Sequence, residues 1–125
     1  MGTRSLTRVY DGKDCVVNMY RQYDGYPSGH GKELATFLNS KRITNGIANP
    51  SDGTANGMGC LAAQMICNFK TEVGGIYMMP TKSGYDAGQD YEYLVRENKV
   101  EVISSGEDLF EGTWAEFAIW CEKED

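Results

Sequence analysis

Long apolar runs and clusters of basic residues are both missing from this chain, and each absence excludes a class of protein. No apolar stretch approaches the roughly 20 residues that a helix needs to cross a bilayer, so we expect no membrane partner. The 12 Lys and Arg are scattered and are outnumbered by 18 Asp and Glu, which gives a net charge of -6. Because binding to a phosphate backbone depends on clustered basic side chains, non-specific binding to nucleic acid is excluded.

Cysteine and histidine are also scarce. His30 is the only histidine, and no two of the four cysteines form a CxxC pair. The cysteines are Cys15, Cys60, Cys67 and Cys121. These are too few and too dispersed for a zinc site, so we expect no metal, and no motif calls for a cofactor. The first residues lack the apolar run of a signal peptide, so we expect reduced thiols and a cytoplasmic protein.

The chain has the length and composition of one globular domain. It has 125 residues, of which 41% are hydrophobic and 24% are charged. A domain near this size buries roughly two thirds of its unfolded surface, so it can form a core without disulfides. We expect a single domain spanning residues 1–125, either as a monomer or as a small homo-oligomer.

Two hairpins and one short strand are predicted from β-formers and turn residues. Residues 4–10 and 14–23 flank a turn at Asp11-Gly12-Lys13. Residues 91–96 and 100–104 flank a second turn at Glu97-Asn98-Lys99. Residues 76–79 form a strand that Pro80 ends.

Three helices are predicted from apolar residues at spacings of three and four. The first runs from Gly31 to about Lys41 or Ile43, and the second from about Gly59 to Glu72, before Gly74-Gly75. The third follows a capping box at Thr113 and Glu116 and runs from 114 to about 123. The order ββααβββα predicts an α+β fold, with an antiparallel sheet of about five strands and helices packed on one face.

The segment Tyr20–Gly31 is the first functional candidate. Tyrosine rings can stack on a base or a sugar, and Arg21 can meet a phosphate or carboxylate. In the alternative interpretation, a strand end simply packs and Asp24-Gly25 opens a turn. The binding candidates are Tyr20, Arg21, Tyr23, Asp24, Tyr26 and His30.

The start of the second helix is another binding candidate. Gly57-x-Gly59-x-x-Ala62 imitates a dinucleotide fingerprint but lacks the βαβ setting. Free backbone N–H groups at a helix start can still hold a phosphate or carboxylate. The candidates here are Asn56, Gly57, Gly59 and Cys60.

Cys60 and His30 are the candidates for catalysis. A thiol in the first turn of a helix has a lowered pKa, and His30 could act as its base. The alternative is that Cys60 packs against the sheet, and that His30 caps Glu33 or lies in solvent.

A second tyrosine-rich segment covers residues 82–93. If it meets Tyr20–Gly31 on one side of the sheet, the two form an aromatic cleft with the turn-rich residues 44–59 as its lid. A surface loop with ordinary turn residues is the alternative.

Three segments resemble small uncharacterised proteins encoded by bacteriophages and their relatives. They are Met1-Gly-Thr-Arg-Ser, Tyr20-Arg-Gln-Tyr-Asp-Gly-Tyr-Pro-Ser-Gly-His-Gly and Asn56-Gly-Met-Gly-Cys-Leu-Ala-Ala-Gln. The resemblance implies a virus-related protein of the host cytoplasm and carries over no catalytic roles.

We therefore expect a non-enzymatic binding protein that recognises a small anionic or nucleotide-like ligand or a host protein. The alternative is a cysteine-dependent hydrolase or transferase that uses Cys60 and His30. A third class is a protein mimic or inhibitor that acts through its negative surface.

Overall fold

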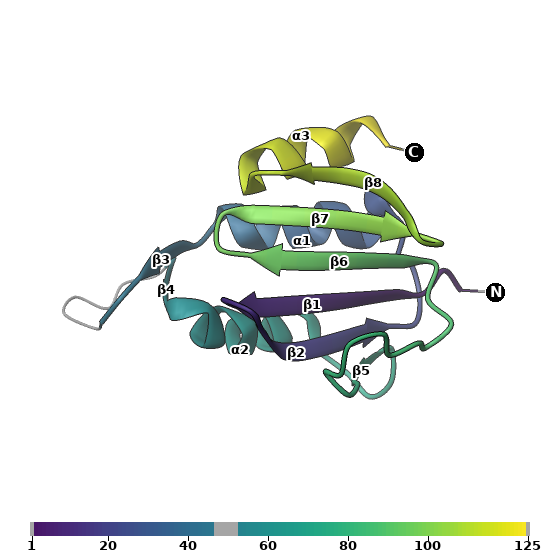
Figure 1. The fold of residues 1–125 in the computed structure, drawn as a ribbon, viewed down its shortest axis with the longest axis horizontal. Helices are drawn as coiled ribbons and strands as arrows, with labels where there is room; N and C mark the ends of the chain where they lie inside the picture. The colour runs from purple at the N-terminus through teal and green to yellow at the C-terminus, as the bar shows by residue number, and fades with distance from the viewer. Residues whose placement is uncertain (1, 47–52, 125) are drawn as a thin grey trace.

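One six-stranded sheet forms the centre of the molecule. In the computed structural model, residues 2–46 and 53–124 are described. The strands lie in the order β5-β2-β1-β6-β7-β8 (Figure 1). Their bounds are β1 (Ser5–Asp11), β2 (Asp14–Arg21), β5 (Ile76–Met78), β6 (Tyr91–Arg96), β7 (Lys99–Ser104) and β8 (Glu107–Gly112). Neighbouring strands are antiparallel except β1 and β6, which are parallel. The α+β class is confirmed.

The number of strands and their order differ from the expectation. Strand β8 was not expected, because its acidic residues hide the strand pattern. It follows a two-residue turn at Ser105-Gly106, whose positive φ angles of 51° and 78° suit a tight hairpin. A wholly antiparallel sheet of about five strands was therefore wrong.

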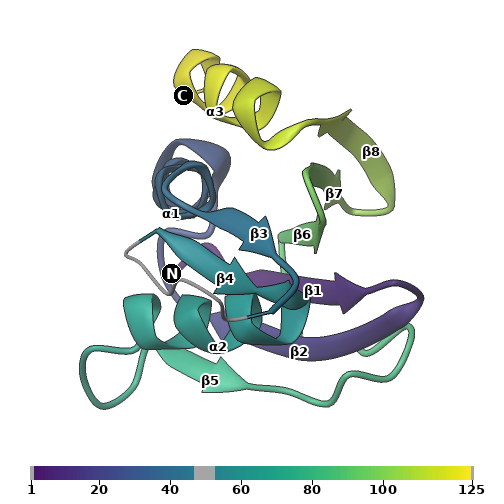
Figure 2. The ribbon, with the colours of Figure 1, turned by 90° about the vertical axis from the view of Figure 1, so that its left-hand side faces the viewer.

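Three helices pack on one face of this sheet. They are α1 (Lys32–Asn39), α2 (Gly57–Phe69) and α3 (Trp114–Lys123). Figures 1 and 2 show them on the same side of the strands. The helices and strands bury a shared core whose fully buried members include Leu34, Leu61, Met65, Val95 and Phe117. Helices on one face are confirmed.

The segment between α1 and α2 contains more structure than expected. Helix α1 ends at Asn39, and residues beyond it form β3 (Arg42–Thr44) instead of more helix. β3 pairs in parallel with β4 (Thr54–Asn56), so this pair lies within a region expected to be largely loop. Residues 47–52 of the expected lid lie outside the described residues.

The parallel β1–β6 pair results from a long crossover on the other face of the sheet. From the edge strand β5, the chain passes in front of the end of β2 and then turns into β6 (Figure 1). Asn18 Nδ2 donates to Pro80 O at 3.0 Å, and Arg8 donates to the carbonyls of Thr81, Lys82 and Tyr85 at 3.3–3.4 Å. The Arg8 side chain is 4% exposed, and its Nε lies 3.6 Å from a Glu92 carboxylate oxygen. A buried cation therefore holds the crossover on the sheet.

Candidate functional site

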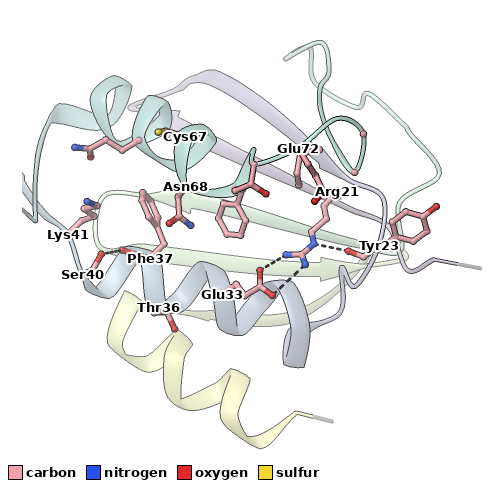
Figure 3. A pocket seen from close by; sticks show the side chains of 16 residues that line it. Arg21, Tyr23, Glu33, Thr36, Phe37, Ser40, Lys41, Cys67, Asn68 and Glu72 are labelled. Atoms are coloured by element: carbon pink, nitrogen blue, oxygen red, sulfur yellow. Dashed lines mark hydrogen bonds and ion pairs between the residues drawn. The ribbon is translucent and has the colours of Figure 1, made fainter.

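A groove with a volume of about 880 Å³ opens between α1 and α2 (Figure 3). Helix α1 packs closely against α3, whereas the backbones of α1 and α2 lie farther apart and the two helices meet through side chains of the shared core. The chain after α2 closes one end of the groove through Gly74, Gly75 and Ile76. Two other cavities in the described part of the chain are smaller, at about 350 and 360 Å³.

The groove has apolar side chains inside and polar groups along both sides. Phe37, Phe69 and Ile76 provide its apolar surface. The polar side chains from α1 and from the two residues that follow it are Glu33, Thr36, Ser40 and Lys41. Those from α2 and the segment that follows it are Gln64, Cys67, Asn68, Thr71 and Glu72.

Arg21 enters the groove from the end of β2 and is held by three groups. Its Nε donates to Tyr23 O at 2.7 Å, and its Nη1 donates to Glu33 Oε1 at 2.8 Å. Nη1 also lies 3.2 Å from His30 Nδ1. The other terminal nitrogen, Nη2, makes one weak contact within the described residues, at 3.5 Å from Glu33 Oε2. The guanidinium is thus fixed in place while one N–H remains available to a ligand.

His30 is fully buried behind Arg21. A guanidinium can only donate, so His30 Nδ1 accepts and the ring proton lies on Nε2, which donates to Thr7 Oγ1 at 2.7 Å. The ring packs against Phe69 and Tyr93, with centroids 5.0 and 5.1 Å away. Burial, helped by the Arg21 charge, lowers the pKa of His30 to about 3. His30 is therefore neutral, and both ring nitrogens are engaged.

The single π-helical turn η1 (Pro27–Gly31) creates this buried position for His30. A Cβ added to Gly31 would lie 3.0 Å from Cys121 Sγ, so the turn packs tightly beneath α3. His30 was expected in solvent, as a cap for Glu33 or as a base. Its burial, with Arg21 between it and Glu33, corrects the first two of these expectations.

The structure does not bring Cys60 and His30 together. Cys60 lies in the first turn of α2 and packs against the core, as in the alternative interpretation. His30 contacts Phe69 at the other end of the same helix. Nine residues of helix separate these positions by about 14 Å. Cys67, not Cys60, lines the groove and is exposed.

Of the ten binding candidates, all within the described residues, Arg21 and Tyr23 line the groove. Tyr20 lies on the opposite face of the sheet, with its ring 6.1 Å from that of Tyr77. Asp24 accepts a 3.2 Å hydrogen bond from Tyr26 Oη outside the groove.

The start of α2 is at the β3–β4 end of the molecule, away from the tyrosine segment (Figure 1). Asn56 Oδ1 accepts from the Gly46 amide at 2.6 Å. Gly57 has a positive φ of 81° where the helix begins, and Gly59 and Cys60 follow in the first turn. None of these four residues lines the groove. The expected convergence of this helix start with the tyrosines is therefore not formed.

The second tyrosine-rich segment touches the first through the buried Tyr93 but does not line the groove. It lines a separate cavity of about 360 Å³ through Tyr85, Asp86, Asp90 and Tyr91. Among residues 44–46 and 53–59 of the expected lid, none lines the groove. The two tyrosine-rich segments thus do not share one cleft.

The groove residues of α1 and α2 were missed by sequence reasoning. Gln64, Cys67 and Asn68 lie on one side of α2 at spacings of three and four from Gln64, and Thr71 follows just after the helix ends. Such a row carries short polar groups where a solvent-facing row usually carries Lys and Glu. This composition is the feature of the sequence from which the groove side of α2 could have been predicted.

Comparison of the chain with protein-family models, curated proteins and solved structures found no match. The resemblance to bacteriophage proteins stays a prediction. No helix in the described ranges 2–46 and 53–124 has the length and apolar character needed to span a membrane.

Proposed function

We propose that this protein is a non-enzymatic binding module that holds a small ligand in the groove between α1 and α2. The observation that carries this proposal is the groove itself. Its volume of about 880 Å³ falls within the range of small-molecule sites, and it combines an apolar interior with a few polar groups.

The chemistry around the groove favours binding over catalysis. Cys67 lines the groove with its thiol, but His30 is buried behind Arg21 and its basic nitrogen already accepts a hydrogen bond. The low pKa of His30, about 3, further weakens it as a base near neutral pH. A cysteine-dependent reaction would need another base.

The charges suit a ligand with groups of both signs. Arg21 and Lys41 contribute two positive charges, and Glu33 and Glu72 contribute two negative charges. A nucleotide-like ligand could use the remaining N–H of Arg21 and the Lys41 ammonium, with its base over the apolar interior. The balance of charges does not demand a purely anionic ligand.

Protection of Cys67 provides the test. The alkylation rate of each thiol by iodoacetamide would be followed by peptide mapping, with a panel of nucleotides, amino acids and short peptides. We expect a groove ligand to slow alkylation of Cys67 and to leave Cys15, on β2 outside the groove, unchanged.

A groove-filling variant with a matched control completes the experiment. Asn68→Trp adds bulk on the groove side of α2, whereas Ala63→Trp adds it at an exposed position of the same helix outside the groove. We expect only Asn68→Trp to abolish protection and binding. The proposed site would be rejected if Asn68→Trp still binds the ligand. It would also be rejected if no compound of the panel slows alkylation of Cys67.

A further inference from the structure

Charges of opposite sign stand at the two ends of the groove. Glu33 and Glu72 lie near Arg21, whereas Lys41 lies at the far end of α1 (Figure 3). Glu33 and Lys41 are eight positions apart in the sequence, which corresponds to about 12 Å along a helix axis. Glu33 is paired with Arg21, but within the described part of the chain neither Glu72 nor Lys41 belongs to an ion pair. The Lys41 ammonium lies 5.5 Å from the centroid of the Phe37 ring, a contact that leaves its charge without a carboxylate partner. One carboxylate and one ammonium can thus each meet a ligand group of opposite charge.

Two carboxamides form a row along the α2 side of the groove. Gln64 and Asn68 are one helical turn apart, so their Cβ atoms are about 6 Å apart. Gln64 Nε2 donates to Thr54 O at 3.1 Å, which fixes the orientation of the amide. Gln64 Oε1 is then a buried acceptor with no hydrogen-bond partner among the described residues. A buried acceptor left in this state favours a ligand that donates an N–H.

The backbone N–H groups of an extended peptide repeat at nearly the distance that separates Gln64 from Asn68. Along one edge of an extended chain, backbone N–H groups recur every two residues, or about 6.8 Å. This spacing is close to that of the Gln64 and Asn68 amides. A span of about 12 Å accommodates three or four residues. Phe37, Phe69 and Ile76 offer an apolar surface to one side chain of such a peptide.

We infer that the groove binds a short extended peptide of three or four residues, with its free amino terminus near Glu72, its carboxylate near Lys41 and an apolar side chain between them. This inference rests on the proposed function and names its ligand class. Gln64 and Asn68 hydrogen-bond the peptide backbone, so recognition depends on the termini and on the apolar residue.

The test uses Gly-Phe-Ala-Ala in three forms: with both termini free, with the amino terminus acetylated and with the carboxyl terminus amidated. Affinity would be measured by isothermal titration, with Cys67 protection as the readout of position. We expect each blocked form to bind roughly two- to fivefold more weakly, because each loses one exposed ion pair. Gln64→Met should weaken all three forms by about fivefold through loss of one hydrogen bond.

Variants of the two free charges assign the orientation. Glu72→Gln should remove the penalty of acetylation but keep that of amidation, and Lys41→Gln should do the reverse. Glu97→Gln and Lys13→Gln change exposed charges outside the groove and serve as matched controls. Equal affinity of all three peptide forms, or penalties that survive both groove variants, would overturn the inference.

The same experiment separates this inference from the proposed function. If a nucleotide or another panel member protects Cys67 while no form of the peptide binds, the peptide assignment is rejected and the binding groove stands. If neither the panel nor the peptides protect Cys67, both are rejected.

Discussion

Lowering the pH should destabilise the protein through His30, the only histidine in the chain. The ordinary pKa of histidine is near 6.5, and burial lowers that of His30 in the folded protein to about 3. The unfolded chain therefore binds the proton first. The stabilisation by neutral His30 is complete above pH 6.5 and is lost as the pH falls from 6.5 toward 3. Between pH 7.5 and 5.5 the linkage relation gives a loss of about 1.4 kcal/mol in the free energy of unfolding.

Urea unfolding at pH 7.5 and 5.5 measures this loss, and a fall in Tm of roughly 5 °C should accompany it. Free carboxylates titrate mainly below pH 5, so this window isolates histidine. His30→Gln is the control, because its stability should vary much less over the same window. As a check that needs no variant, the NMR resonance of the His30 Cε1 proton should show no titration above about pH 4. A titration midpoint near 6.5 would refute the reasoning.

Three further predictions concern the packing of the sheet and the last helix. Phe117→Ala should lower the free energy of unfolding by about 3–5 kcal/mol in urea titrations, because the ring is fully buried against Tyr93 and Phe110; a loss below about 1 kcal/mol would contradict the core described. Arg8→Met should speed hydrogen exchange in residues 79–90, because the crossover loses its buried donor, whereas unchanged exchange would show that Arg8 does not hold it. Thr113→Ala should cost about 1 kcal/mol in thermal unfolding by removing the helix cap, and an unchanged Tm would argue against the cap.

Local structure was predictable where a few neighbouring residues determine it. The capping box forms as expected, with Glu116 N donating to Thr113 Oγ1 at 3.1 Å and Thr113 N donating to Glu116 Oε1 at 2.8 Å. The first hairpin also turns at the expected place, where Gly12 has a positive φ of 62°. The parallel β1–β6 pair was not predictable, because it depends on contacts between Arg8 and a segment more than 70 residues away.

The tyrosine segment shows why the site was only partly predictable. Its variety of polar and aromatic groups indicated an exposed recognition loop, and Arg21 and Tyr23 do line the groove. His30 is instead fully buried. Gly25 serves close packing, since a Cβ added to Gly25 would lie 2.8 Å from the Ser5 Cβ. The same residue types serve recognition or close packing, and only tertiary contacts distinguish the two.

The parallel pairing of β1 with β6 has a consequence for how the protein is made. Residues 5–9 sit in the middle of the sheet, yet their partners on one side are residues 91–95. During synthesis the β1–β2 hairpin emerges from the ribosome long before β6 is made. One edge of β1 therefore lacks its backbone hydrogen-bond partners while residues up to β6 are translated. Chains arrested before β6 would expose this edge, and they should be the species that associate with one another or with a chaperone.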